Sequence, residues 1–191
     1  MKLALLILVA SAPALAQVRV EPRSFVKERH FFFSGGLTWL DRNDYYVSPG
    51  GAFSAVYYFR ESDGVELRTA FFWSHLDGSA QEVVSQAGLY PDAQKPQVLL
   101  LVGWRHSLTY GKVALFSTVV HFDVQSGVHA GTLMTDRAAT PALAGSFGVV
   151  AGIGRRAFAQ LDLALLGSME SRSERVLALG LLPLLTFGWS L

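Results

Sequence analysis

Apolar and polar side chains alternate with a period of two along several stretches of the chain. The alternation is cleanest between Val65 and His75, where the odd-numbered positions up to Trp73 carry Val, Leu, Thr, Phe and Trp. The even-numbered positions carry Glu, Arg, Ala, Phe and Ser. Successive side chains of a β-strand point to opposite faces, so this stretch is predicted to be a strand with one apolar and one mixed face.

Eight stretches of this kind are predicted strands. They are His30–Leu40, Gly51–Arg60, Val65–His75, Gln97–Ser107, Lys112–Asp123, Ala142–Gly154, Ala157–Leu166 and Arg175–Leu191. The fourth and fifth form the central hairpin, with a tight turn expected at Leu108–Gly111 because glycine is permissive there. Each arm of this hairpin has about the 9–11 residues that a tilted strand needs to cross a bilayer.

The connections between these strands alternate in length. Residues 41–48, 76–96, 124–141 and 167–174 form long loops, whereas 61–64, 108–111 and 154–156 form short turns. Short turns at one end and longer loops at the other are typical of outer-membrane barrels, which have an even number of strands. Residues 29–191 are therefore predicted to be all-β, an eight-stranded antiparallel up-and-down transmembrane β-barrel. Within 76–96, Ser79, Glu82 and Gly88 predict a short helix near 80–87.

The four tryptophans fit the same topology. Trp39 and Trp73 lie at the outer ends of predicted outward strands, and Trp104 and Trp189 lie at the inner ends of inward strands. Indole rings prefer the membrane–water interface, so the four are expected to form two aromatic belts.

The first 16 residues have the pattern of a secretory signal peptide. Lys2 precedes the apolar run Leu3–Val9, and Ala14–Ala16 resembles a cleavage site. Residues 17–28 are polar and are predicted to be a periplasmic N-terminal segment. The chain has no cysteine, which excludes disulfides and lipoprotein attachment.

The amino-acid composition of the chain limits which binding partners are expected. Half of the chain is apolar and only 16% is charged, against roughly 25% in a typical soluble protein. Without residues 1–16, 15 basic residues balance 15 acidic ones, which gives nucleic-acid binding no support. The expected surroundings are outer-membrane lipid and lipopolysaccharide, in the outer membrane of a Gram-negative bacterium.

A soluble exported barrel of the lipocalin type is the competing fold. Such a barrel has an apolar lumen and a polar exterior. Here the apolar face is the more uniform one and is flanked by aromatic residues, which favours the membrane barrel. Two features fit less well: Leu99 and Leu101 would point inward, and Pro183 within a strand should cause a bulge or a lost ladder bond.

An eight-stranded barrel has an interior that side chains just fill. The charged residues predicted to face this lumen are Arg60, Glu66, Arg68, Arg105, His121, Asp123 and Asp162. Buried charges must pair, so we expect a structural salt-bridge network. The alternative is a narrow proton or ion path.

No residue is predicted to be catalytic, to bind a cofactor or to bind a metal. Ser117, His121 and Asp123 share a face, but Ser117 and His121 would lie roughly 13 Å apart on one strand, too far for a hydrogen bond. His75 and His129 are two lone histidines and a weak metal signal.

The segment Pro96–Gly131, with the order PQxLxxxGWR, YGKVAxF and VxHFD, resembles the outer-membrane β-barrel domain family of myxobacteria and related bacteria. Gly148–Ser173 resembles the sixth and seventh strands of that family. Some members are associated with envelope-spanning complexes of gliding motility. The resemblance implies a fold and a location rather than a chemistry.

The expected function is therefore a non-catalytic outer-membrane barrel, a structural or interaction component of the envelope. Loops 76–96 and 124–141 are the expected contacts to other envelope proteins, because binding groups usually lie on loops of a rigid scaffold. The alternative is a small lipid-modifying enzyme of the lipid A deacylase type.

Overall fold

A computed structural model describes residues 26–115, 118–154, 156–171 and 174–191. The predicted signal peptide and most of the segment 17–28 lie outside the described residues. The strands are β1 (Phe31–Leu40), β2 (Tyr46–Tyr58), β3 (Asp63–Phe72), β4 (His75–Leu76), β5 (Pro96–Leu115), β6 (Thr118–Thr135), β7 (Ala139–Ile153), β8 (Ala157–Ser171) and β9 (Arg175–Ser190), with one helix, α1 (Gly78–Ala87).

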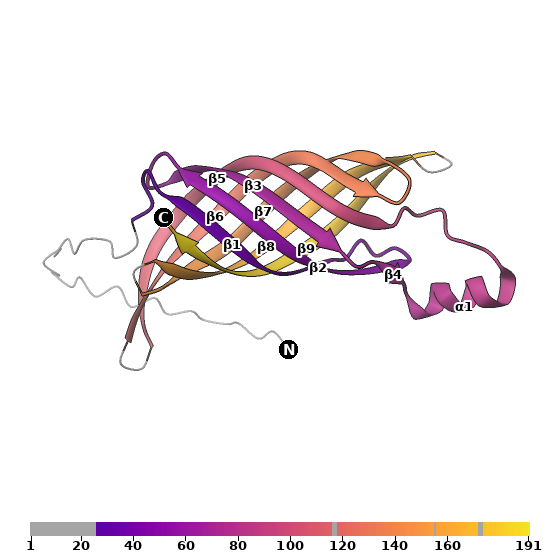
Figure 1. The fold of residues 1–191 in the computed structure, drawn as a ribbon, viewed down its shortest axis with the longest axis horizontal. Coiled ribbons are helices and arrows are strands. Elements are labelled where there is room, and N and C mark those ends of the chain that lie inside the picture. The colour runs from indigo at the N-terminus through magenta and orange to yellow at the C-terminus, as the bar shows by residue number, and fades with distance from the viewer. Residues whose placement is uncertain (1–25, 116–117, 155, 172–173) are drawn as a thin grey trace, which may run out of the picture.

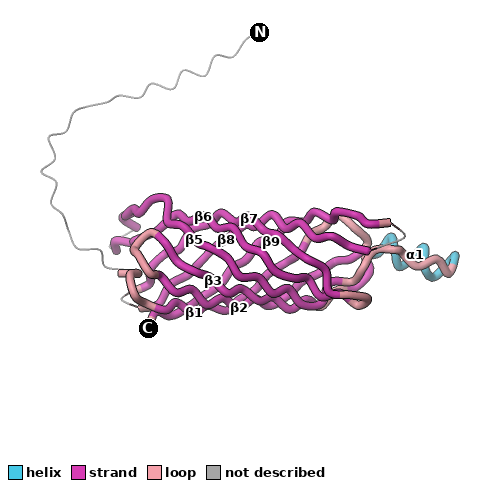
Figure 2. Tube along the Cα trace, turned by 90° about the horizontal axis from the view of Figure 1, so that it is seen from above, coloured by secondary structure: helices cyan, strands magenta, loops and turns pink. Residues whose placement is uncertain are grey.

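The eight long strands form a closed antiparallel barrel (Figure 1). Each pairs with its neighbours in the chain, and β1 pairs with both β2 and β9, which closes the ring. The two-residue strand β4 pairs only with the outer end of β2. Figure 2 shows the strands running at a tilt along a cylinder, with α1 beyond one end. The predicted eight-stranded up-and-down barrel is confirmed.

The central hairpin is longer than the sequence predicted. β5 continues through the expected turn at Leu108–Gly111, and β6 occupies most of the expected loop 124–141. Gly111 is needed for packing rather than for a turn, because a Cβ there would lie 2.4 Å from the Phe122 ring. Residues 124–134 pair with β7, so the connection between β6 and β7 shrinks to 136–138. Both boundary predictions were wrong.

The connection between β3 and β5 is the longest outer loop of the described residues and carries α1. The predicted helix is confirmed, but its N-cap is Asp77 rather than Ser79: the Asp77 carboxylate accepts a hydrogen bond from the Ala80 backbone N–H at 2.6 Å. Gly88 ends the helix with φ of 67°, the left-handed conformation that glycine tolerates. In Figure 1 the helix stands clear of the barrel wall. No α-helix in the described ranges is both long and apolar enough to cross a membrane.

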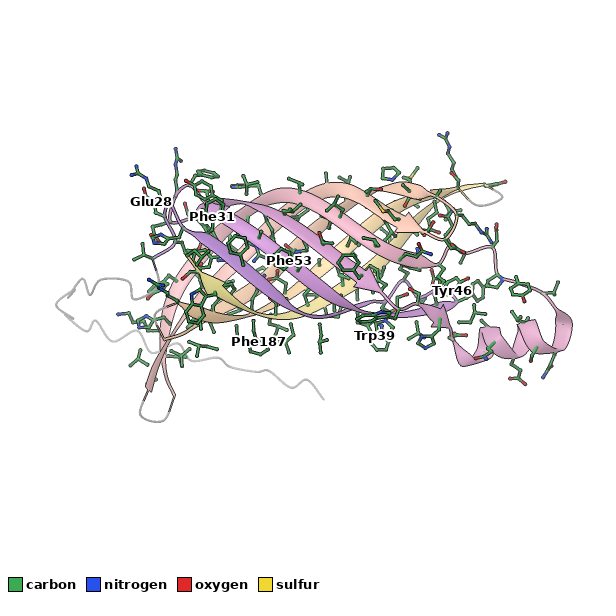
Figure 3. The ribbon with its side chains drawn as sticks, in the orientation of Figure 1. Glu28, Phe31, Trp39, Tyr46, Phe53 and Phe187 are labelled. Atoms are coloured by element: carbon green, nitrogen blue, oxygen red, sulfur yellow. The ribbon has the colours of Figure 1, made fainter. Side chains whose placement is uncertain are left out.

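The outer wall of the barrel is apolar. Along β7 and β8 the burial pattern alternates residue by residue, with Leu143, Phe147, Leu161 and Leu165 exposed. All four tryptophans are exposed; Trp39, Trp73 and Trp189 lie at or next to strand ends, whereas Trp104 lies within β5 and pairs with Val65 near the start of β3. Figure 3 shows Trp39 and Phe187 on the outside of the ribbon. This pattern matches lipid contact flanked by two aromatic belts.

Pro183 interrupts one ladder without changing its register. The pairing of β9 with β1 ends at Thr38 and Leu184 and resumes as a single bridge between Asp41 and Leu181. The predicted loss of ladder bonding is confirmed, and the Thr38 hydroxyl donates a hydrogen bond of 2.9 Å to the Pro183 carbonyl.

Candidate functional site: the lumen and its two mouths

The middle of the lumen is held by a cluster of four charged side chains. β3 contributes Glu66 and Arg68, β5 contributes Arg105 and β8 contributes Asp162. Arg68 Nη2 lies 2.9 Å from Glu66 Oε1 and 2.6 Å from Asp162 Oδ2, and Arg105 Nε lies 3.0 Å from Glu66 Oε2. Arg105 also pairs with Asp162. Each guanidinium thus contacts both carboxylates, and the cluster is electrically balanced.

Three further side chains complete this cluster. His129 Nε2 lies 2.9 Å from Glu66 Oε2, Ser54 Oγ donates to Glu66 Oε1 at 2.6 Å, and Gln160 Nε2 donates to Asp162 Oδ2 at 2.8 Å. Burying a charge costs much free energy unless such partners replace the hydrogen bonds that water made to it. We call the set Glu66, Arg68, Arg105, His129 and Asp162 the charge layer.

Glycines on the neighbouring strands make room for the Asp162 and His129 side chains. A Cβ on Gly148 would lie 1.9 Å from Asp162 Oδ1, and a Cβ on Gly103 would lie 2.5 Å from the His129 ring. The cross-strand pairs Gly148–Asp162 and Gly103–His129 explain these contacts. The charge layer therefore depends on the absence of side chains at those two positions.

Beside the charge layer, on the side toward α1, the lumen has an apolar layer, whereas the sequence predicted a polar lumen. Leu99 and Leu101 do point inward, as expected, and each is at most 1% exposed. With their neighbours they form what we call the apolar layer: Leu40, Ala52, Ala70, Phe72, Leu99, Leu101, Leu133, Ala142, Ala144, Ala164, Leu166, Leu182 and Leu184. A layer packed to this extent excludes water from the bore.

The mouth at the start of β1 and the end of β9 is closed by Lys27. Its ammonium pairs with Asp123, donates to Ser107 Oγ at 2.6 Å and lies 5.0 Å from the centre of the Tyr58 ring. Gln125 Nε2 donates to the same carboxylate at 2.8 Å. The Tyr58 ring belongs to a small apolar cluster of Phe32, Val56, Tyr58, Val150 and Phe158.

The opposite mouth is closed by Arg42. Its guanidinium pairs with Glu170 and lies 2.6 Å from Asp44 Oδ2. Gln94, which is buried, donates to the Ser171 carbonyl at 2.7 Å and accepts from Thr135. Both ends of the bore thus finish in a buried ion pair.

Two of the residues predicted for the lumen lie elsewhere. Arg60 is exposed in the turn after β2, because β2 ends at Tyr58 and the chain turns back. His121 is half-buried and pairs across the hairpin with Lys112, beyond the last residue at which β7 accompanies β6. Its ring contacts the Tyr110 hydroxyl. Asp123 is in the lumen but meets Lys27 instead of the charge layer.

Four buried residues face the lumen although the sequence did not predict it: Lys27, Arg42, His129 and Glu170. For His129 a signal was present: Asp123, Gln125, Gly127 and His129 fall on alternate positions, with Val124 and Val128 between them. The other three lie in or beside connections, where no periodicity indicates the direction of a side chain.

The described residues contain little that suggests catalysis. No three His, Asp or Glu side chains among them gather in a way that could hold a metal ion. At the first residue of β3, Ser62 from the preceding turn and His106 from β5 both contact the Asp63 carboxylate. A Ser-His-Asp triad places histidine in the middle, so this order does not activate the serine.

A groove of about 750 Å³ lies at the outer end, between α1 and the loop that joins β1 to β2. Its lining includes the apolar side chains Tyr45, Val83, Leu89 and Tyr90, each more than half exposed. Asp44 and Asp77 also line it, and no lysine or arginine does.

A closed antiparallel barrel with an apolar outer wall and a filled interior is the architecture of a transmembrane β-barrel. No family model matches the chain, and no curated protein matches it in sequence. Among solved structures it is similar to Ail, the attachment invasion locus protein of Yersinia pestis, with a TM-score of 0.45 and 10% identity over 86% of this chain and 99% of Ail. Similarity at that level carries no information about what this chain does.

Proposed function

We propose that this protein is a sealed, non-catalytic barrel of the outer membrane that serves as a structural or interaction component of the cell envelope. The single observation that carries the proposal is the filled bore: a charge layer, an apolar layer and an ion pair at each mouth. A bore closed in this way leaves the barrel as a rigid support.

The location is supported by the barrel's surface and by the start of the sequence. An apolar wall between two sets of exposed tryptophans suits a bilayer, with lipid and lipopolysaccharide as its surroundings. The predicted signal peptide would bring the chain to the periplasm, from which outer-membrane barrels insert. The start of β1, the end of β9 and the turns after β2 and β7 then lie on the periplasmic side, and α1 lies outside.

The groove beside α1 is the proposed contact surface. Exposed apolar side chains on a rigid scaffold favour a protein partner over water. Asp44 is already paired with Arg42, but Asp77 also lines the groove and no lysine or arginine does, so the partner segment should place a lysine or arginine beside apolar residues. Loop 76–96 supplies most of the residues that line this groove, whereas 124–141 is mainly strand. The resemblance to motility-associated barrels suggests that the partner belongs to an envelope-spanning complex.

Removal of the outer loop tests this role. Replacing residues 78–91 by a Gly-Ser linker should leave a folded, inserted barrel, seen as heat-modifiable migration on a gel, that no longer forms the crosslinks of the parent. A finer pair of variants is Tyr90→Ser, which should weaken the crosslinks, and Gln86→Ser on the same loop but outside the groove, which should not. A trimmed barrel with every crosslink of the parent would exclude the loop as the contact surface.

The lipid A deacylase alternative has its own test. Mass spectrometry of lipid A from a deletion strain should show the acylation pattern of the parent. Lipid A that gains an acyl chain when the gene is deleted would instead establish an enzyme.

A further inference from the structure

The ladder between β1 and β9 has a gap on the side toward α1. Asp41 and Leu181 exchange backbone hydrogen bonds of 2.9 and 2.7 Å, so they form a hydrogen-bonded pair. Such pairs recur at every second residue of an antiparallel ladder, and in this register the next one is Trp39 with Pro183. Proline has no N–H, so the Trp39 carbonyl receives no hydrogen bond from β9.

A groove of about 350 Å³ lies over this gap, on the outer wall of the barrel. Its lining includes both residues of the gap and the last ladder pair before it, Thr38 and Leu184. Thr38 and Leu184 are buried and belong to the inner face of the wall. Because the groove reaches residues of the inner face, it is cut into the wall. Its volume is in the range of ligand sites, roughly 300–1,000 Å³.

The groove is aligned with the strands. Trp39, which Figure 3 shows on the outside of the ribbon, and Trp73 lie at its end toward α1, and both indoles are exposed. At the other end, the cross-strand pairs Leu37–Leu185 and Leu161–Leu185 form a row of leucines across β1, β9 and β8. Indole rings prefer the membrane interface, whereas leucines suit hydrocarbon. The groove therefore follows the direction of an acyl chain from its head group into the bilayer.

The polar groups at the gap accept hydrogen bonds and do not donate them. The Trp39 carbonyl can only accept, and the Thr38 hydroxyl already donates its hydrogen to the Pro183 carbonyl at 2.9 Å. Water is scarce in lipid, and a backbone group left there without a partner is costly. A chain that brings a hydrogen-bond donor to the gap is therefore preferred over a plain hydrocarbon chain.

We propose that this groove binds one acyl chain of an outer-leaflet lipid and selects a chain with a hydroxyl or amide N–H close to its head group. The donor would bond to the Trp39 carbonyl, and the chain would lie on the row of leucines. Lipopolysaccharide is the source that fits, because its lipid anchor carries amide-linked and hydroxylated chains. This inference rests on the outer-membrane location proposed above and gives one lipid a fixed place on the barrel.

The test uses the full chain folded in micelles of lauryldimethylamine oxide, a detergent without a hydrogen-bond donor. Two phosphatidylcholine probes differ only in a hydroxyl on the third carbon of each chain. Titration followed by native mass spectrometry should show that the hydroxylated probe binds roughly three to ten times more tightly, the range that one net hydrogen bond provides. Equal binding of the two probes by the parent would overturn the proposal.

Pro183→Leu supplies the missing N–H. The new donor completes the ladder pair with Trp39, so the preference for the hydroxylated probe should disappear. Pro141→Leu is the matched control, because Pro141 is exposed on β7 and lies outside the groove, and it should keep the preference. Heat-modifiable migration checks that both variants fold. A folded Pro183→Leu protein that prefers the hydroxylated probe as the parent does would overturn the proposal.

Leu185→Trp tests the groove without touching the gap. A larger ring among the leucines should keep the chain away from Trp39 and abolish the preference. Leu143→Trp, an exposed position of β7 outside this groove, should retain it. This pair decides the question even if Pro183→Leu does not fold. The same preference in both leucine variants would mean that lipid binds around the whole wall, which would overturn the proposal.

A different occupant of the groove would also overturn it. A parent dimer in micelles that Leu185→Trp converts to a monomer would mean that a second copy covers the groove. Probe binding in micelles does not depend on where the protein lies in the cell, whereas protease shaving of intact cells tests that location directly. Failure of the lipid site and failure of the location are therefore distinguishable.

Discussion

The charge layer and the apolar layer occupy the same bore and share the same wall, yet they are stabilised in different ways. Arg68 and Leu101 are cross-strand partners, one in each layer, and both are almost completely buried. The apolar layer needs only a set of side chains that fills the volume. The charge layer needs every member, because each guanidinium contacts both carboxylates.

The comparison teaches that a filled bore is not uniformly tolerant of change. Loss of a buried apolar group leaves a cavity whose cost depends on how far its neighbours relax. Loss of one buried charge leaves a carboxylate without compensation in a site that water does not reach. Four substitutions, in order of expected effect, separate these two cases.

The largest effect is expected for Arg68→Met. The substitution keeps most of the volume but removes a guanidinium shared by Glu66 and Asp162. The free energy of unfolding, measured in urea, should fall by about 4 kcal/mol. Arg60→Met is the matched control, since Arg60 is exposed in a turn. Equal unfolding midpoints for the two variants would contradict a charge layer that matters for stability.

Leu101→Ala should cost somewhat less. It removes three buried heavy atoms from the apolar layer, and the expected loss is about 3 kcal/mol in the same urea titration. Leu100→Ala, one residue earlier on the lipid-facing side, should cost less because lipid can fill the gap. A larger loss at Leu100 than at Leu101 would argue that the bore is loosely packed.

Gly148→Ala tests how closely the charge layer is packed against the wall of the barrel. The new methyl group would meet Asp162 Oδ1 at 1.9 Å, so the carboxylate must shift away from its arginines. We expect a loss of about 2 kcal/mol, typical of overpacking. Gly145→Ala on the same strand meets no atom within 4 Å and should be neutral. Neutral behaviour of both would show that Asp162 can move freely.

The smallest effect is expected where an ion pair faces water. Arg137 and Asp92 lie 3.1 Å apart at the outer end, and both side chains are about half exposed. Arg137→Ala should lower the free energy of unfolding by about 0.5 kcal/mol, and salt should reduce the difference further. A loss comparable to that of Arg68→Met would remove the distinction between buried and exposed pairs on which the comparison depends.

Local periodicity made the faces of the strands predictable. Alternation alone placed Val65, Leu67, Phe71 and Trp73 on one apolar face, and all four are exposed on the outer wall. Alternation needs only the order of residues, because a strand turns its side chains over at every step. The same reasoning placed Glu66, Arg68, Arg105 and Asp162 on the inner face before any contact between them was known.

The length of a strand was less predictable than the face on which each of its side chains lies. Tyr110-Gly111 has the composition of a turn, but the chain passes through it as strand because Phe122 packs over the glycine. Gly111 and Phe122 become cross-strand partners only in the register that the hairpin adopts, and the composition of the turn does not fix that register. The extended hairpin and the position of His129 in the lumen were therefore missed together.

Sequence alone determined the number of long strands, the apolar outer wall and the positions of the tryptophans, because each follows from local order. The tertiary structure decided the pairings. Lys27 meets Asp123 across 96 positions of the chain, and Arg42 meets Glu170 across 128. Such partners depend on register and on the curvature of the closed barrel, which a period of two leaves open. For that reason the two ion pairs that close the ends of the bore could be recognised only in the folded molecule.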